Sequence, residues 1–142
     1  MLIKVNGNEL SVKEHNLVMP ISRKIKKSKK LLESEGDLYG VEGPCPPGEY
    51  YIFYRLRVGG DRLEFSSNKP KELITFDHTQ GILFSPKGSR RTNIQIHLGT
   101  KSKGCILIEK KNQKMYWDLL KLVSEKLNKK ELVKIKVDEY WK

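Results

Sequence analysis

The sequence predicts a mostly β domain with one C-terminal helix, an α+β fold in which the sheet dominates. Short segments rich in aromatic and β-branched residues recur at close spacing between residues 50 and 108. After that region the apolar period changes from two residues to about 3.6, as in an amphipathic helix. Neither an internal repeat nor a linker divides the sequence, so we expect a single domain over residues 1–142.

The N-terminal third predicts a hairpin followed by a basic, polar stretch. Residues 2–14 alternate apolar and polar side chains around Asn6 and Gly7, a pair that favours a tight hairpin turn. The polar stretch runs to about Gly40, and we expect one helical turn in it near Lys29–Ser34.

The central part predicts a series of short strands. Residues 43–58 begin with a rigid Pro-Pro-Gly turn and continue into an aromatic and β-branched run, which predicts a strand over Tyr50–Val58. Further strands are expected over residues 61–67, 72–76, 81–86, 93–98 and 105–108.

The C-terminal part predicts a helix and a last strand. Residues 112–130 have the helical period, with Asn112 as the expected N-cap. One face carries the apolar residues Tyr116, Leu119, Leu120, Val123 and Leu127. This stripe predicts core packing rather than a groove for a partner. The strand follows over residues 131–141, with Leu132, Ile135 and Val137 as its expected apolar anchors.

The charge pattern favours a polyanionic partner. The net charge is +11, from 28 basic and 17 acidic residues, which suits nucleic acid, anionic lipid or an anionic wall polymer. A solvated, lysine-rich surface explains it equally well. The densest basic run, residues 22–30, contains no aromatic residue, unlike the platforms that stack single-stranded bases.

Several classes of protein and site are not expected from the sequence. No apolar run approaches the roughly 20 residues that span a bilayer, and residues 1–16 lack the features of a signal peptide. Two cysteines are too few for a disulfide scaffold, and three scattered histidines give no metal-ligand spacing. We therefore expect no metal and no organic cofactor.

The segment NIQIHLGTKSKGCILIE, residues 93–109, carries the candidate chemistry. Gly104 permits a sharp turn before Cys105 that can aim backbone amides at an oxyanion, and Ser102 can hydrogen-bond this bend. If the strand ending at Leu98 pairs with the strand starting at Cys105, His97 lies close to the thiol. An adjacent imidazole activates a thiol as a nucleophile, although a small buried cysteine is an equally open interpretation.

Two ordered motifs add a family resemblance. IHLGTKSKGCI, residues 96–106, resembles the active-site segment of the L,D-transpeptidases (YkuD-like domains), a histidine followed by Ser/Thr-x-Gly-Cys. GPCPPGEYYI, residues 43–52, resembles the Pro-x-Gly-x-Tyr/Phe segment that this superfamily carries upstream. The form is most similar to short members used as type VI secretion effectors or found in phage-related genes. The resemblance covers about residues 40–125.

The resemblance implies roles for individual residues. Cys105 would be the nucleophile and His97 its general base. Gly99, Ser102 and Gly104 would shape the loop, with the amides of Gly104 and Cys105 as the oxyanion hole. The implied fold is a β-rich, YkuD-like sandwich or barrel with the cysteine on a strand beside a cleft.

The sequence also departs from the family pattern. The usual arginine two residues after the cysteine is Leu107 here. Arg90 or Arg91 could bind the substrate carboxylate instead, although a solvated basic pair would look the same. Tyr51 is a candidate to line a peptide groove. Cys45 could pair with Cys105 under oxidising conditions.

The expected function is cysteine-dependent acyl transfer on peptidoglycan stem peptides. Water as acceptor gives L,D-carboxypeptidase activity, and an amine gives L,D-transpeptidase activity. Expected partners are peptidoglycan, an anionic wall polymer, and an immunity or carrier protein. We expect a protein that is cytoplasmic as made and is delivered to the periplasm or cell wall by a secretion system or phage route. The alternatives are a non-enzymatic basic β module that binds nucleic acid or another polyanion, and a phage structural protein that kept the fold without the activity.

Overall fold

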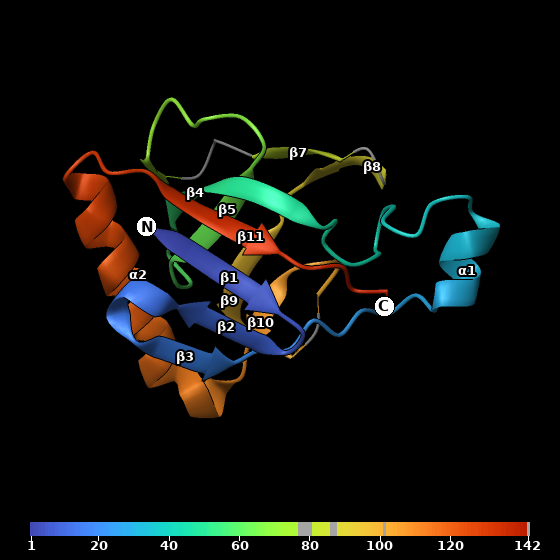
Figure 1. Cartoon of the computed structure of the whole chain (residues 1–142), viewed down its shortest axis with the longest axis horizontal. Coiled ribbons are helices and arrows are strands. Elements are labelled where there is room, and N and C mark those ends of the chain that lie inside the picture. The colour runs from blue at the N-terminus through green and yellow to red at the C-terminus, as the bar shows by residue number, and fades with distance from the viewer. Residues whose placement is uncertain (77–80, 86–87, 101, 142) are drawn as a thin grey trace.

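A computed structural model of the chain describes residues 1–76, 81–85, 88–100 and 102–141. It is mostly β with one C-terminal helix, as predicted (Figure 1). The strands are β1 (Leu2–Asn6), β2 (Glu9–Val12), β3 (Leu17–Pro20), β4 (Gly48–Leu56), β5 (Arg62–Ser66), β6 (Ile74–Phe76), β7 (Ile82–Ser85), β8 (Gly88–Thr92), β9 (Gln95–Leu98), β10 (Ile106–Ile108) and β11 (Val133–Val137). The helices are α1 (Lys29–Ser34) and α2 (Gln113–Asn128), with 3-10 turns over Lys13–His15 and Lys110–Asn112.

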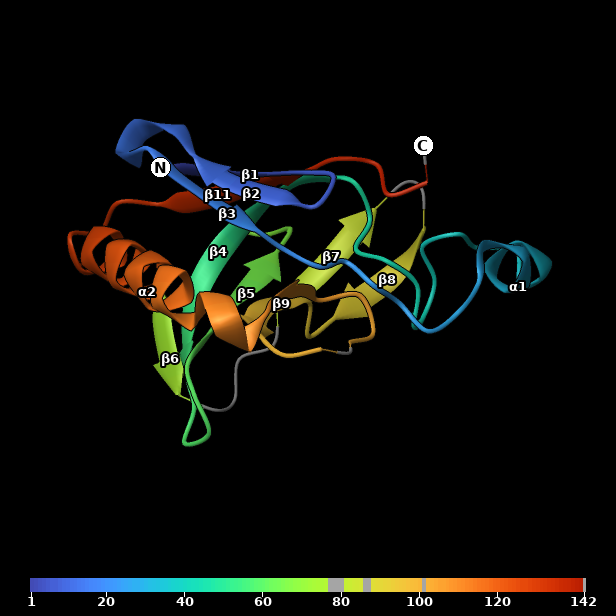
Figure 2. The same ribbon diagram turned by 90° about the horizontal axis from the view of Figure 1, so that it is seen from below.

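The main sheet curves until it is nearly closed. Its strand order is β10-β9-β5-β4-β11-β1-β2-β3, and β6 adds to β4 in parallel. Beyond β3, Ser22 exchanges two backbone hydrogen bonds of 2.8 Å with Leu107 of β10, which brings the two edges of the sheet together. The hairpin of β7 and β8 forms a second, two-stranded sheet, away from α2 (Figure 2).

Helix α2 packs on the main sheet through the predicted face. Tyr116, Leu119, Leu120, Val123 and Leu127 are all buried in the core. Asn112 precedes the helix, but its side chain makes no capping hydrogen bond because a 3-10 turn leads into α2. The short helix α1 lies where one helical turn was expected, and Ser28 Oγ caps it by accepting from the Leu31 amide at 3.1 Å.

The structure differs from the sequence prediction at three elements. Strand β3 lies within the stretch expected to be polar, because Met19 buries its side chain while β3 pairs with β2. Strand β8 was also not predicted. In β11 the buried residues are Val133, Ile135 and Val137, whereas Leu132 precedes the strand and is half-buried. The expectation that Leu132 anchors this strand was therefore wrong by one residue.

A search of the described residues finds no helix that combines the length and apolar character of a membrane span.

Candidate active site

Strands β5 and β9, together with the residue that precedes β10, place the candidate residues on one face of the sheet. The register pairs Glu64 with Phe53 on one side and with Gln95 on the other, so these side chains share a face. Alternation places Leu63 and Ile96 on the opposite face, in the core packed by α2. We call the first surface the polar face. Its polar members in this region are Arg55, Arg62, Glu64, Gln95, His97 and Cys105, and the buried side chains of Phe53 and Leu107 lie among them.

The strands bearing His97 and Cys105 do pair, but in parallel. His97 lies beside Leu107, and continuing the register by one residue places Cys105 beside Gln95. The 99–105 loop carries the chain back along β9 before β10 begins. His97 and Cys105 are consequently diagonal neighbours on the polar face, roughly 8 Å apart between Cα atoms by the usual strand rise and spacing.

Cys105 is a buried thiol at rest. The residue is 9% exposed, and its Sγ donates a hydrogen bond to the Asn93 carbonyl at 3.4 Å. Burial raises the pKa of this thiol, while a backbone hydrogen bond from Gln95 and the nearby charges of Arg62 and Arg91 lower it. The net shift is upward, so the thiol is protonated at neutral pH and needs a base before it can attack.

His97 has the protonation state that such a base requires. Its Nδ1 lies 2.8 Å from the Leu98 carbonyl, which assigns the proton to Nδ1 and leaves the lone pair on Nε2. Burial lowers the pKa of the imidazole, and the positive charges of Arg62 and Arg57 lower it further against the effect of the Leu98 bond. His97 is therefore neutral at physiological pH, with Nε2 able to accept a proton.

The two side chains are held at opposite ends of β9 in this resting arrangement. The Cys105 thiol is hydrogen-bonded to the carbonyl of Asn93, which precedes β9. The His97 ring is hydrogen-bonded to the carbonyl of Leu98, at the end of β9. Among the hydrogen bonds of the described residues, none joins Cys105 Sγ to the His97 ring. Catalytic hydrogen bonds commonly tighten only when substrate binds.

The 99–105 loop depends on Gly104. This residue has φ +107°, and a Cβ here would lie 2.5 Å from Arg91 Nη2 and 2.7 Å from the Gly43 carbonyl oxygen. Ser102 Oγ donates to the Cys105 carbonyl at 3.1 Å, and the Gly99 amide donates to Ile108 at 3.2 Å. All three predicted loop residues thus lie in the turn that presents Cys105.

Arg91 has a different role from the one expected. Its buried guanidinium donates to four backbone carbonyls, those of Tyr39, Gly43, Pro44 and Lys103, at 2.7–3.1 Å. These bonds tie residues 39–44 to the 99–105 loop. With its donors used in this way, Arg91 is a structural support for the loop, which corrects the expectation that it binds the substrate carboxylate.

The other two substrate-binding candidates lie apart from His97. Arg90 is exposed, and its guanidinium lies 5.7 Å from the centroid of the Phe84 ring. Tyr51 is on β4 beside Ser66, and Lys134 Nζ lies 5.2 Å from the centroid of its ring. Of the two, Arg90 lines the cavity at Cys105 and Tyr51 does not.

A cavity of about 260 Å³ opens beside Cys105. Its lining residues are Val41, Glu42, Arg90, Arg91, Thr92, Asn93, Lys103 and Cys105. Glu42 and Lys103 form a salt bridge of 3.1 Å at this cavity, and their hydrogen bond lowers the pKa of the Glu42 carboxyl. His97 is not among the residues that line this cavity.

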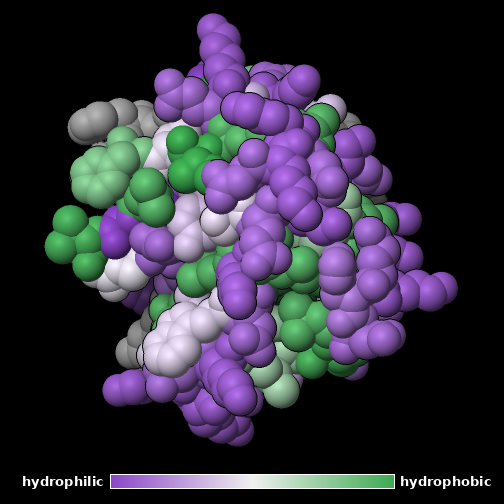
Figure 3. Space-filling model, turned by 90° about the vertical axis from the view of Figure 1, so that its left-hand side faces the viewer, coloured by the Kyte–Doolittle hydropathy of each residue, from purple (hydrophilic) through white to green (hydrophobic). Residues whose placement is uncertain are grey.

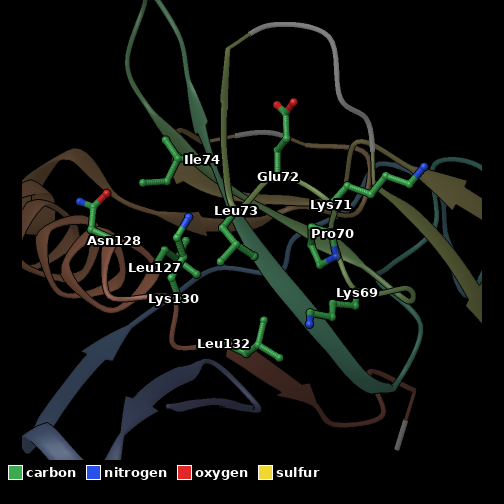
Figure 4. Close-up of a pocket in the computed structure, with 10 residues that line it drawn as sticks. All are labelled: Lys69, Pro70, Lys71, Glu72, Leu73, Ile74, Leu127, Asn128, Lys130 and Leu132. Carbon is green, nitrogen blue, oxygen red and sulfur yellow. The ribbon is translucent and has the colours of Figure 1, made fainter.

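Two further hollows flank other parts of the sheet. One of about 330 Å³ lies beside the 99–105 loop and is lined by Lys24, Ile25, Lys26, Thr100 and Ser102. A larger one of about 600 Å³ lies near the C-terminal end of α2, where Leu73, Leu127 and Leu132 meet a rim of lysines (Figure 4). The residues that line the larger hollow include no cysteine or histidine.

A series of buried, hydrogen-bonded polar side chains supports the site, and the sequence did not predict it. Glu64 is fully buried and accepts hydrogen bonds from Arg55 Nη1 at 2.7 Å, Gln95 Nε2 at 2.6 Å and the Gly81 amide at 2.5 Å. Gln95 Oε1 in turn accepts from Arg62 Nη1 at 2.8 Å. The available signal was the placement of Arg62 and Glu64 at alternate positions of one strand, which puts both on one face.

Cys45 is buried in the same part of the molecule, where Arg91 and Cys105 act on its thiol. It is 2% exposed, its Sγ is 3.5 Å from the Pro46 carbonyl oxygen, and burial raises its pKa to about 12. Both cysteines are free thiols. Among the described residues, no group of three or more His, Cys, Asp and Glu side chains is arranged to hold a metal ion.

No protein-family model, no curated protein and no solved structure matches the chain.

Proposed function

We propose that the protein catalyses cysteine-dependent acyl transfer on peptidoglycan stem peptides, as an L,D-transpeptidase, an L,D-carboxypeptidase or both. One observation carries the acyl-transfer chemistry of this proposal: Cys105 and His97 share the polar face, one as a protonated thiol and the other as a neutral imidazole. This combination suits proton transfer from sulfur to nitrogen during attack. The peptidoglycan substrate is what the resemblance of the two sequence motifs implies.

The chemistry follows from these two groups. His97 Nε2 accepts the thiol proton as Cys105 Sγ attacks the scissile carbonyl, and the amides of Gly104 and Cys105 stabilise the oxyanion. The tetrahedral intermediate collapses, the C–N bond breaks, and the imidazolium gives its proton to the leaving amine. Water or an amine then attacks the thioester, and the product leaves with the acyl group while the thiol regains a proton.

The surface charge suits a substrate embedded in an anionic wall. Hydrophilic side chains cover most of the side that carries α2, with apolar groups in small patches between them (Figure 3). A net charge of +11 would hold the protein on anionic wall polymer and raise its local concentration at the stem peptides. Delivery by a secretion system or a phage, with an immunity or carrier protein as partner, is part of the same proposal.

Digestion of purified sacculi tests the proposal. Wild-type protein and Cys105→Ala are incubated with sacculi, and the released muropeptides are identified by mass spectrometry. We expect tetrapeptides to become tripeptides, or new cross-links or exchanged D-amino acids to form, with the wild type alone. Unchanged muropeptides with a folded wild-type sample would contradict the proposal.

The charge also supports a second candidate, a basic β module that binds nucleic acid or another polyanion. In that case binding of a duplex or single strand falls steeply with salt, and Cys105→Ala binds as well as the wild type. A titration at several salt concentrations distinguishes this outcome from catalysis.

A further inference from the structure

Arg62 lies directly beside the candidate base. The antiparallel register of β5 and β9 pairs Leu63 with Ile96 and Glu64 with Gln95, and continuing it by one residue places Arg62 next to His97. Leu107 is the neighbour of His97 on the other side, in β10. The sheet thus presents Arg62, His97 and Leu107 in a row across three strands, all on the polar face.

Buried contacts hold the Arg62 guanidinium in place. Its Nη1 donates to Gln95 Oε1 at 2.8 Å, and Gln95 is fixed in turn by the fully buried carboxylate of Glu64. Arg62 itself is half-buried, and among the described residues this is the one hydrogen bond that its side chain makes. An arginine has five N–H donors and stays protonated in proteins, so most of its binding capacity remains for a ligand.

The other arginines near the site are engaged differently. Arg91 donates to four backbone carbonyls, Arg55 pairs with Glu64 at 2.7 Å, and Arg90 is stacked on Phe84. Arg62 is also a charge that acts on both Cys105 and His97. Among these four residues, it is the guanidinium placed to meet a substrate group beside the reacting atoms.

We propose that Arg62 binds the free carboxylate of the leaving amino acid and so selects donor peptides that end one residue after the scissile amide. This inference rests on the proposed function. His97 must lie at the leaving nitrogen in order to protonate it. In a C-terminal residue the carboxylate is attached to the carbon bonded to that nitrogen, so it lies beside His97, where Arg62 can hold it with two parallel N–H bonds.

Arg62, on β5, would then bind the carboxylate, a role that Leu107 cannot fill because its side chain carries no charge. The row across the sheet places the two residues on opposite sides of His97. Substrates that continue past the leaving residue, or that end in an amide, lack the charge and leave Arg62 without a partner.

Binding to the inactive Cys105→Ala protein tests this inference without needing turnover. The probes are the tetrapeptide L-Ala-γ-D-Glu-meso-diaminopimelyl-D-Ala and its C-terminal amide, titrated by calorimetry. We expect the acid to bind about 10- to 100-fold more tightly than the amide, the range for a charge-assisted pair. Adding Arg62→Gln should remove this difference, and Arg62→Lys should restore part of it because lysine lacks the planar fork.

Arg57→Gln is the matched control. Arg57 is an exposed arginine whose charge also reaches His97, but it lies beyond the end of β4. We expect this variant to keep the preference for the acid. Equal binding of acid and amide, absence of binding by both, or an unchanged preference in Arg62→Gln would overturn the inference. Failure of the proposed function is seen separately, as absence of turnover of the acid by the wild type.

Discussion

Strands β5, β9 and β10 form one end of the main sheet, and the two faces of this end differ in role. One face packs in the core, and the other carries the candidate site. On one face Leu63, Ile96 and Ile106 are at most 1% exposed and pack in the core. On the other, the residues next to them in sequence, Arg62, His97 and Cys105, form the candidate site. The difference shows that local alternation decides which residues leave the core. The pairing of distant strands then decides which of them meet.

Substituting His97 tests the polar face with the largest expected effect. His97→Gln removes the base while keeping a polar side chain, and we expect turnover to fall by about 100- to 10,000-fold. Raising the pH should restore only part of the rate, since leaving-group protonation is also lost. Steady-state kinetics on a stem tetrapeptide measure this, with unchanged thermal unfolding as the control. Full activity in this variant would remove His97 from the mechanism.

Substituting Arg91 distinguishes a role in supporting the 99–105 loop from a role in substrate binding. Arg91→Gln leaves the carbonyls of Tyr39, Gly43, Pro44 and Lys103 without their charged donor. We expect a loss of about 3–5 kcal/mol in the free energy of unfolding, because several buried charge-assisted bonds are broken together. Urea unfolding measures it. A variant of wild-type stability with only a raised KM would instead support the substrate-binding role.

Ile96 is the sequence neighbour of His97 and points to the other face. Ile96→Ala creates a cavity in the core, and we expect it to lower the free energy of unfolding by about 2–4 kcal/mol. The folded fraction should keep its rate per molecule, because the polar face is intact. Urea unfolding and turnover at low temperature measure the two effects. A rate loss as large as that of His97→Gln, with normal stability, would show that the faces are not separable in this way.

The thiols give the smallest and most local test. Burial raises the pKa of Cys105, so less thiolate is present at a given pH than in a free cysteine. Iodoacetamide labelling of Cys105, followed by mass spectrometry, should reach half its maximal rate at a higher pH than a cysteine peptide. Cys45, with a pKa of about 12, should stay unlabelled over the same range. Half-maximal labelling at or below the pH of the peptide would indicate a resting thiolate, in place of the protonated thiol described above.

The sequence was sufficient for most of the fold, because its signals are local. The hairpin of β1 and β2, the strands after the proline turn and the buried stripe of α2 each follow from a short periodic pattern. Strand β3 was not predictable in this way, because its few apolar residues can be identified as part of a strand only from their pairing with β2. Leu132 was misplaced because it precedes β11, in which the buried residues alternate as Val133, Ile135 and Val137.

The candidate site depended more on pairings between distant segments. The glycine before Cys105 and the nearby histidine could be read from the sequence, and both lie in the region expected. The parallel pairing of β9 and β10 could not be predicted from the sequence, because a short loop between neighbouring strands favours an antiparallel hairpin. The burial of Arg91 and the chain from Glu64 through Gln95 to Arg62 likewise join segments that are far apart in the sequence.

Trapping the acyl-enzyme tests the central claim most directly. The protein is mixed with a stem tetrapeptide, quenched in acid after a short time, and weighed intact by mass spectrometry. We predict an added mass equal to the tripeptide acyl group, located on Cys105 after digestion, in the wild type and in Cys45→Ala. Cys105→Ala should show none. An adduct on another residue, or turnover of the peptide with no adduct and full activity in Cys105→Ala, would contradict Cys105 as the nucleophile.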